Sequence, residues 1–433
     1  MRPAGRLQAA IEVLEEVLKR HQPAPMALAN WGRAHRFAGS GDRAAIGNLV
    51  YDALRQRNSM AARMQADTPR ALAFAAAADA FAMSRDDVAA LADGAQHAPA
   101  ALSEKERLGL MREADAAAPA HILGDYPEWL QASFERVFGA RAATEGVALA
   151  ARAPVDLRVN TLKSTMEKMH KALARHHIAL APLTPVGLRI AATKGPRKQA
   201  HVESEAAHGK GWFEVQDAGS QLAALMAGAG PRQQVADICA GSGGKTLAMA
   251  AGMHNTGQIY AYDSDRRRLR PIFERLKRAG VRNVQVLDGG DEQALRALAG
   301  RFDVVLVDAP CSGTGTWRRR PDAKWRLKPG NIAERQREQQ AVLRLAAPLL
   351  KPGGRLSYVT CSVLAEENSD QVAWFLAENP DFSILPYAAV WAQHLPGAPP
   401  LSADGREDSL LLTPASHDVD GFFIAVFERR QKP

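Results

Sequence analysis

The sequence predicts a mixed α/β protein whose main part is a Rossmann-like, doubly wound and mostly parallel sheet. Three observations support this prediction. From about residue 232 onward, apolar strand-like runs alternate with amphipathic helical runs. A glycine-rich turn, "GSGGKT", follows the first of these runs. At 433 residues the chain is also too long for one ordinary hydrophobic core, so further domains should precede the sheet.

Residues 1–120 are expected to form an all-α domain. Leu7, Ile11, Leu14 and Leu18 follow the 4-3-4 spacing of a helical apolar stripe, and Asp42 is placed to cap the start of a later helix. The alanine-rich run "RALAFAAAADAFAMS" is typical of a buried helix in a soluble protein. No motif in this region indicates catalysis.

Residues 121–215 mix strand-like and helical runs. "VDLRVNTLK" alternates apolar and polar residues as a half-buried strand does, "TMEKMHKALARHHIAL" predicts a helix, and "PVGLRIA" predicts another strand. We therefore expect a small α+β module. Its basic residues are compatible with an RNA-binding domain of the RRM-like kind.

Residues 216–433 carry the strand–turn–helix pattern. The runs "QVADICA", "GQIYAYDSD", "VRNVQVLD", "FDVVLVDAP" and "RLSYVTCS" are predicted strands, separated by helical runs such as "ERQREQQAVLRLAAPLL". Ligands and catalytic groups of doubly wound sheets collect at the carboxyl ends of the strands. Two of the three cysteines fall at such ends, in "VVLVDAPCSGTG" and "VTCSVLAEEN".

The chain is basic, with a formal charge of +8 and a pI near 9.5. This excess suits a nucleic-acid partner. The densest basic run, "WRRRPDAKWRLK", comes just after the first strand-end cysteine motif. Such a run is most often a solvated surface loop, but its place beside a candidate active site favours contacts with phosphates.

The composition also indicates the cellular compartment of the protein and whether it binds a metal. No apolar stretch is long enough to span a bilayer, and the start "MRPAGRLQAA" lacks the apolar core of a signal peptide. Three cysteines argue against a disulfide framework and fit the reducing cytoplasm. No Cys/His cluster has the spacing of metal ligands, so no metal is expected. We expect no membrane association and a monomer.

The turn "DICAGSGGKT" resembles a P-loop but lacks its first glycine, because Cys239 stands five residues before Gly244. The turn can instead bring the backbone close to another nucleoside cofactor. Asp263, at the next strand end, could accept both ribose hydroxyls, and Asp288, one strand later, could receive an adenine amine. This order predicts an S-adenosylmethionine pocket. Each acid alone could equally cap a helix, and Asp291 competes with Asp288 for the adenine role.

A thiolate beside a methyl donor suggests nucleophilic activation of an unreactive carbon such as carbon 5 of cytosine. Addition at carbon 6 makes carbon 5 an enamine carbon that can attack a methyl sulfonium, and a second group must then assist elimination. Cys361, Cys311 and Asp308 can supply these roles if their strand ends are neighbours. A lone cysteine is more often a small buried hydrophobe, and we read Cys239 in this way. The chemistry alone does not decide which of the two thiols attacks.

Several motifs resemble the Nop/Sun family of RNA cytosine-5 methyltransferases, and within it the bacterial 16S ribosomal RNA methyltransferase B subgroup. These motifs are "DAPCSGTG" with "RRRPDAKW", then "TCSVLAEEN", together with "LRVNTLK", "VQDAGSQL" and "DGFFIAVFERR". The resemblance covers about the last two-thirds of the chain. The helical N-terminus is similar to the NusB-like RNA-binding domain of that subgroup, and together with the middle module it would help to position RNA.

The resemblance implies roles for individual residues. Cys361 would be the nucleophile, Cys311 would promote product release, Asp308 would orient the cytosine, and Lys245 would lie near the cofactor and the target base. The cofactor-binding residues it implies are Cys239, Ala240, Gly241, Ser242, Gly243, Gly244, Lys245, Asp263, Asp288 and Asp308.

The glycine loop departs from the family pattern at two positions. The family usually has Cys-Ala-Ala-Pro-Gly-Gly-Lys, whereas Gly241 and Ser242 replace Ala-Pro in this chain. Loss of the proline loosens the turn and should weaken cofactor binding somewhat without abolishing it.

The expected activity is therefore S-adenosylmethionine-dependent formation of 5-methylcytosine in RNA, with 16S ribosomal RNA as the expected substrate. The target base must leave any stack or pair to reach Cys361. Transfer RNA is an alternative substrate. A non-catalytic ribosome-assembly protein would have lost a catalytic cysteine or the glycine loop, and a methyltransferase for exocyclic nitrogen would need no thiol. The chain keeps both cysteines and the glycine loop, which argues against a non-catalytic protein. A methyltransferase for exocyclic nitrogen would leave the two strand-end cysteines unexplained.

Overall fold

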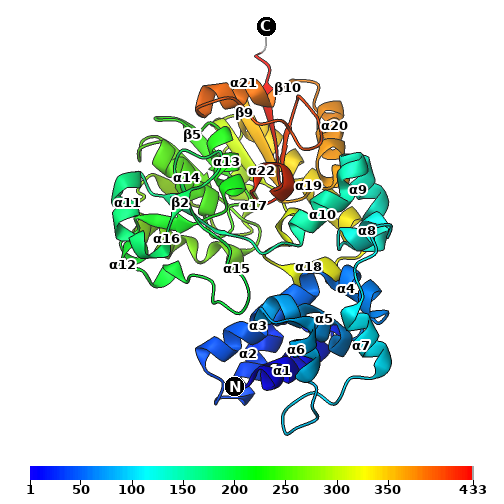
Figure 1. Ribbon diagram of the computed structural model, residues 1–433. Helices are drawn as coiled ribbons and strands as arrows, with labels where there is room; N and C mark the ends of the chain where they lie inside the picture. Colours follow the sequence, from blue (N-terminus) through cyan, green and yellow to red (C-terminus); the bar gives the residue numbers. More distant parts are fainter. Residues whose placement is uncertain (432–433) are drawn as a thin grey trace. The chain divides into compact units, whose positions relative to one another are not determined.

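The computed structural model describes residues 1–431, which form two compact units. The first, here called the helical unit, comprises Met1–Ala153, Ala192–Gln199 and Trp317–Leu327. The second, the sheet unit, comprises Pro154–Ala191, Ala200–Thr316 and the chain from Lys328 onward. Figure 1 colours the helical unit mostly blue to cyan and the sheet unit mostly green to red. Among residues 1–431, no helix is long and apolar enough to cross a membrane.

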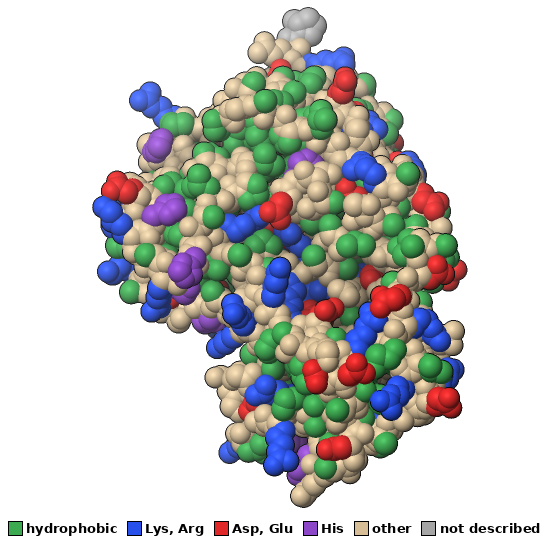
Figure 2. Space-filling view, viewed as in Figure 1, with side chains coloured by type: hydrophobic (Ala, Val, Ile, Leu, Met, Phe, Trp, Pro, Cys, Tyr) green, Lys and Arg blue, Asp and Glu red, His purple; other side chains and the backbone are tan. Residues whose placement is uncertain are grey.

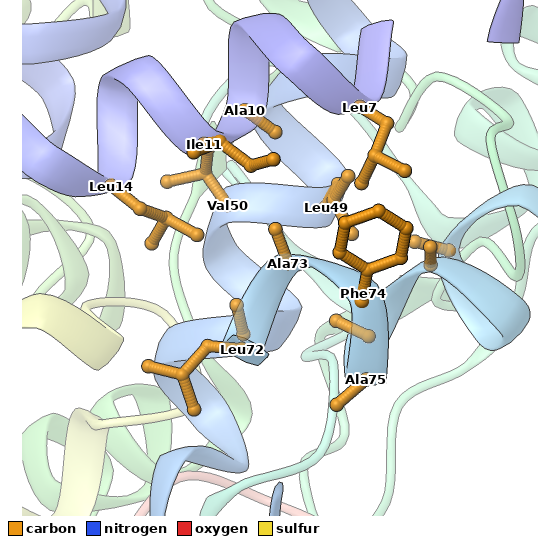
Figure 3. Packing of buried hydrophobic residues seen from close by; sticks show 14 of the residues in the cluster. Leu7, Ala10, Ile11, Leu14, Leu49, Val50, Leu72, Ala73, Phe74 and Ala75 are labelled. Carbon is orange, nitrogen blue, oxygen red and sulfur yellow. The ribbon is translucent and has the colours of Figure 1, made fainter. Parts of the chain in front are cut away.

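The helical unit is built around three helices that share one apolar core. The apolar stripe of α1 packs against α3 and α5, and Leu7, Leu49 and Phe74 meet in this core (Figure 3). Helix α5 is the predicted alanine-rich helix, and it is buried on nearly all sides. The helices of this unit are α1 (Pro3–Leu18), α2 (Ala24–Ala34), α3 (Ser40–Arg55), α4 (Arg57–Met64), α5 (Pro69–Phe81), α6 (Arg85–Ala90), α7 (Glu104–Met111), α8 (Ala120–Leu123), α9 (Gln131–Phe138), α10 (Ala142–Leu149) and α18 (Pro321–Arg326), with 3-10 turns at Glu128–Leu130 and Gly139–Arg141.

The prediction that Asp42 caps a helix start is wrong by three positions. Helix α3 begins at Ser40, and its N-cap residue is Gly39. Asp42 lies in the first turn, where its carboxylate accepts a hydrogen bond from the Gly39 N–H (3.3 Å) and another from Arg6 (2.8 Å). The acid still satisfies a free N–H at the helix start, but it reaches back from inside the helix.

The basic run after the first cysteine motif is largely a packing element of the helical unit. Lys324, which is 1% exposed, donates hydrogen bonds to the carbonyls of Arg55 (2.8 Å) and Asp125. Trp325 donates its indole N–H to the carbonyl of Leu54 (2.5 Å). This run is therefore not simply a solvated surface loop. The contacts with phosphates that we expect from it remain a prediction.

The sheet unit begins with a small four-stranded antiparallel sheet in the order β2-β3-β1-β4. Its apolar face packs on short helices, as expected for an α+β module. Its elements are β1 (Val155–Val159), α11 (Met166–Ala172), β2 (Ala179–Leu180), β3 (Gly187–Ile190), α12 (Ala206–Gly209) and β4 (Phe213–Val215), with 3-10 turns at Ala174–His176 and Val202–Ser204.

The large sheet confirms the doubly wound prediction. Its order is β10-β12-β9-β8-β5-β6-β7, with β11 paired to β12. The strands from β9 to β7 are parallel, whereas β10, β11 and β12 add an antiparallel edge. The strands are β5 (Gln234–Asp237), β6 (Gln258–Ala261), β7 (Val284–Val286), β8 (Phe302–Asp308), β9 (Leu350–Thr360), β10 (Phe382–Leu385), β11 (Leu410–Leu412) and β12 (Phe422–Arg429).

Helices connect these strands and cover the sheet (Figure 1). They are α13 (Ala218–Met226), α14 (Gly244–Gly252), α15 (Arg266–Leu269), α16 (Ile272–Ala279), α17 (Glu292–Arg296), α19 (Pro329–Ala346), α20 (Ser369–Glu378), α21 (Tyr387–His394) and α22 (Pro414–His417), with 3-10 turns at Thr314–Thr316, Ala347–Leu349 and Ala365–Glu367. Because β5, β8 and β9 are neighbours, the carboxyl ends of all three open onto one edge of the sheet.

Candidate active site

The structure brings the two strand-end cysteines together. Asp308, the last residue of β8, pairs in register with Val359 of the parallel strand β9, and Cys361 follows the end of β9 directly. The sulfur atoms of Cys311 and Cys361 lie 3.3 Å apart, and both thiols are free. The hydrogen bond to Cys361, together with burial, raises the pKa of the Cys311 thiol well above its ordinary value.

Backbone and hydroxyl hydrogen bonds hold the two cysteine loops against each other. The Gly315 N–H donates to the carbonyl of Cys361 (2.9 Å), and the Val363 N–H donates to the Thr314 hydroxyl (2.9 Å). A further bond joins the hydroxyls of Thr314 and Ser362 (3.1 Å). The short distance between the thiols is thus built into the loops rather than left to two flexible side chains.

Glu367 is the buried centre of this arrangement, and the sequence analysis did not single it out. Its carboxylate accepts hydrogen bonds from the Ser312 N–H (2.8 Å), the Ser312 hydroxyl (2.5 Å) and the Gln339 amide (3.2 Å). The residue is fully buried, and burial raises the pKa of its carboxyl above the usual range. The available signal was an acid in "TCSVLAEEN", close after Cys361, but the pattern cannot tell a buried acid from a surface one.

Asp308 and Lys245 form an ion pair at the same edge of the sheet. Lys245 lies in the first turn of α14, and its ammonium donates to the Asp308 carboxylate (2.6 Å). Lys245 is only 8% exposed, and its ammonium also lies 5.2 Å from the centre of the Phe422 ring. The pair joins the glycine turn after β5 to the end of β8, so the predicted cofactor loop and the predicted catalytic acid are in direct contact.

The glycine turn itself requires glycine where the backbone adopts positive φ. Gly243 has φ +85°, and a Cβ there would lie 2.5 Å from Ile272 of α16. Gly241, at φ +51°, donates its N–H to the Asp263 carboxylate (2.9 Å). Asp263 is 1% exposed and also accepts from the Asp265 N–H (2.9 Å), so this predicted ribose acid supports the turn as well.

Ser242 has a partner that fixes the turn in the absence of a proline. Arg275 of α16 donates to the carbonyl (2.8 Å) and the hydroxyl (2.7 Å) of Ser242. Glu214 of β4 holds the same guanidinium (2.9 Å). The small sheet therefore supports the glycine turn through Arg275, which offsets part of the looseness expected from the missing proline.

The two competing adenine-side acids differ in their surroundings. Asp291 is the N-cap of α17 and accepts from the Ala294 N–H (2.9 Å), so it has the helix-capping role. Asp288 is exposed, forms an ion pair with Arg266 (2.5 Å), and lines a surface groove together with Phe273. The role of Asp288 at the adenine side of the cofactor therefore stays a prediction.

Asp237, at the end of β5, was not singled out from the sequence. It accepts a hydrogen bond from the Thr246 hydroxyl (2.7 Å), while its other carboxylate oxygen is buried without a partner among the described residues. Burial raises the pKa of this carboxyl to about 7. An unpaired buried oxygen beside a glycine turn fits a bound nucleoside cofactor with amino or hydroxyl donors. Burial also raises the pKa of nearby Cys239, as expected for an inert thiol.

No group of three or more His, Cys, Asp or Glu side chains among residues 1–431 is arranged to hold a metal ion. At the sheet edge, the described residues instead provide two thiols and an acid–lysine ion pair, next to a glycine-rich turn of the backbone.

Comparisons with known proteins place this chain among methyltransferases. Residues 225–428 match the family described as 16S rRNA methyltransferase RsmB/F, and residues 126–194 match the ferredoxin-like domain of RsmF/B-like methyltransferases. The chain is 34% identical over 308 residues to the probable ribosomal RNA small subunit methyltransferase B of Synechocystis, an alignment that covers 69% of this chain and 66% of that protein. It is 33% identical over 323 residues to ribosomal RNA small subunit methyltransferase B of Sodalis glossinidius, which covers 74% of this chain and 69% of that one.

A solved structure shares the fold. The crystal structure of a methyltransferase homolog from Pyrococcus horikoshii superposes with a TM-score of 0.58 at 29% identity, and the match covers 72% of this chain and 97% of that chain. The comparisons leave the NusB-like prediction for the N-terminus without support or contradiction, so it stays a prediction.

Proposed function

Because the chain belongs to the RsmB/F family of 16S rRNA methyltransferases, we propose that it transfers a methyl group from S-adenosylmethionine to carbon 5 of a cytosine in ribosomal RNA. The observation that carries this proposal is the pair of free thiols 3.3 Å apart beside the Lys245–Asp308 ion pair. A methyltransferase acting on an oxygen or on an exocyclic nitrogen has no use for a thiol nucleophile. We expect the reaction in the cytoplasm, where the RNA would be available.

In this proposal the two thiols have different roles. The hydrogen bond to Cys361 and burial raise the pKa of Cys311, which favours its protonated form, so Cys311 can donate a hydrogen bond to the sulfur of Cys361. Cys361 then adds to carbon 6 of the cytosine, forming an S–C6 bond and making carbon 5 nucleophilic. After carbon 5 has received the methyl group, a solvent water accepts the carbon 5 hydrogen as a proton. The electrons of that C–H bond re-form the C5–C6 double bond, the S–C6 bond breaks, and Cys361 leaves as a thiolate that accepts a hydrogen bond from Cys311.

The remaining residues bind and orient. Asp308 holds the cytosine by accepting a hydrogen bond from its amino group, and the Lys245 ammonium holds the Asp308 carboxylate in place. The bound cofactor supplies the electrophilic methyl group. The glycine turn 239–245, Asp263 and Asp288 would hold it, and the unpaired oxygen of Asp237 offers one further acceptor.

Two experiments test the proposal. Bisulfite sequencing of ribosomal RNA from cells with and without the gene should show one cytosine that loses its protection. Failure to find such a position in any ribosomal RNA would contradict the substrate assignment, and a protected position in transfer RNA would replace it.

The division of labour between the thiols has its own test. Cys311→Ala should accumulate a covalent protein–RNA adduct that survives denaturing electrophoresis, because attack by Cys361 continues while release is impaired. Cys361→Ala should form no adduct. The opposite pattern, an adduct in Cys361→Ala only, would reverse the two roles.

A further inference from the structure

A stack of aromatic rings lies on the surface of the helical unit, at the end of α2. The rings of Trp31 and His35 are 4.3 Å apart between centroids and nearly parallel, and Phe37 meets His35 edge-on at 5.8 Å. The Trp31 indole N–H donates to the Glu12 carboxylate (3.1 Å), and a His35 ring nitrogen lies 2.9 Å from the Trp31 carbonyl oxygen. These contacts hold two of the rings in place without any ligand.

The last ring of the stack is open to solvent. Phe37 is 73% exposed, and it borders an open groove of about 1000 Å³ between the start of α1 and residues 93–98. The rest of the groove is lined partly by small apolar residues, such as Ala4, Ala9 and Ala98, and partly by polar and charged side chains; among these are Arg2, Gln8, Glu12, Gln96 and His97. An aromatic face beside hydrogen-bond donors and acceptors differs from the continuous apolar surface that a protein partner usually covers.

One arginine reaches the groove, and two more lie near the aromatic stack in the chain. Arg2 lines it, and Arg33 and Arg36 are exposed beside the stack. The acids Glu12 and Asp93 also line the groove; Glu12 accepts hydrogen bonds from Gln8 (3.2 Å) and Trp31, and Asp93 accepts from the Ala95 N–H (2.9 Å). Figure 2 shows Lys and Arg side chains spread over the drawn face together with Asp and Glu side chains. The arginine that lines the groove, and that a bound phosphate would meet there, is Arg2.

We propose that this groove binds an unpaired nucleotide of the RNA substrate, with Phe37 stacked on the base and Arg2 in contact with its phosphate. Single-stranded RNA is recognised in this manner, by bases stacked on aromatic side chains and phosphates paired with cations. The inference rests on the proposed function, because it takes RNA as the substrate. It assigns the helical unit a direct contact with RNA outside the thiol site.

The test uses the full chain and a fluorescent, unstructured oligoadenylate of roughly ten nucleotides. Phe37→Ala should weaken binding by about 10-fold to 100-fold, as expected for the loss of one stacked base, and should leave the salt dependence unchanged. Phe37→Trp should retain the affinity. Arg2→Gln should instead reduce the slope of log Kd against log salt by about one.

Met26→Ala is the matched control, because Met26 is also exposed (55%) on α2 but does not line the groove. It should bind as the wild type does. The inference fails if the wild-type chain does not bind the oligonucleotide, if Phe37→Ala binds within about twofold of wild type, or if Met26→Ala loses as much. Failure of the proposed function is distinguishable, since absence of any Cys361 adduct in the wild-type chain and in Cys311→Ala would leave a Phe37-dependent oligonucleotide affinity intact.

Discussion

Glu367 links the two loops that carry the thiols. Its carboxylate holds the loop of Cys311 through two bonds to Ser312, while Glu367 itself belongs to the segment that follows Cys361. Its own carbonyl accepts from the Tyr358 hydroxyl (2.6 Å), which anchors this segment to β9. Glu367 is thus a positioning residue for both cysteines.

We predict that Glu367→Gln loosens the thiol pair. The amide keeps the size of the side chain but weakens the bonds to Ser312, and one amide N–H would face the Gln339 amide. The free energy of unfolding should fall by about 1 to 3 kcal/mol. Oxidation of Cys311 and Cys361 by diamide to an intramolecular disulfide, followed by counting free thiols, should become several-fold slower.

The control for this prediction is Glu378→Gln, which removes an exposed acid from the same region of the chain, at the end of α20. This variant should change neither the free energy of unfolding nor the rate at which diamide oxidises the two thiols. If Glu367→Gln loses stability but its thiols oxidise at the wild-type rate, Glu367 supports the fold without setting the distance between the sulfurs.

At the scale of the element, α18 shows how a basic run can serve packing. Lys324 of this helix is buried with its ammonium on two carbonyl oxygens, and burial lowers the pKa of its amine to about 7. The ordinary lysine pKa is 10.5, so between about pH 7 and pH 10 the unfolded chain binds a proton that the folded chain does not. The contribution of Lys324 to the free energy of unfolding therefore rises with pH between about pH 7 and pH 10.

Lys324→Met should remove this contribution. The wild-type free energy of unfolding should rise with pH relative to the variant by about 1.4 kcal/mol per pH unit between about pH 7 and pH 10, as measured by urea unfolding at both ends of the window. Lys328→Met, which removes an exposed lysine just beyond α18, should show the wild-type slope. Parallel stability curves for wild type and Lys324→Met would contradict a lowered pKa at this position.

The same elements show where sequence reasoning succeeds and where it stops. The period of the apolar runs predicted the parallel strands, and the rule that sites lie at strand ends brought Cys311, Cys361 and Asp308 to one edge. In contrast, a polar side chain that is buried by a distant segment leaves no periodic pattern in the sequence. The role of Glu367 depends on Gln339 and Ser312, and that of Lys324 depends on α3 and Asp125, so neither could be read from its own neighbourhood in the chain.

At the scale of the whole molecule, the chain order and the compact units do not coincide. The helical unit takes most of its residues from the N-terminal part but completes itself with Ala192–Gln199 and Trp317–Leu327. Both segments are fixed by side chains: Asn48 donates to the carbonyl of Gly195 (3.1 Å), and the rings of Trp317 and Phe134 stack at 6.0 Å. A boundary drawn along the sequence therefore cuts through packed side chains.

This organisation predicts that a fragment of residues 154–433, expressed alone, will not be a soluble monomer. Without the first 153 residues, Trp317, which is 1% exposed in the full chain, loses Phe134, and Lys324 and Trp325 lose their carbonyl partners. Each such aromatic side chain returns about 150 to 250 Å² of surface to water, so the fragment should aggregate and elute in the void volume of a sizing column. Replacing residues 317–327 with a glycine–serine linker should restore a monodisperse fragment, because the linker carries no apolar surface to bury. If the unmodified fragment is as soluble as the linker variant, the inserted segment is not an integral part of the helical unit's core.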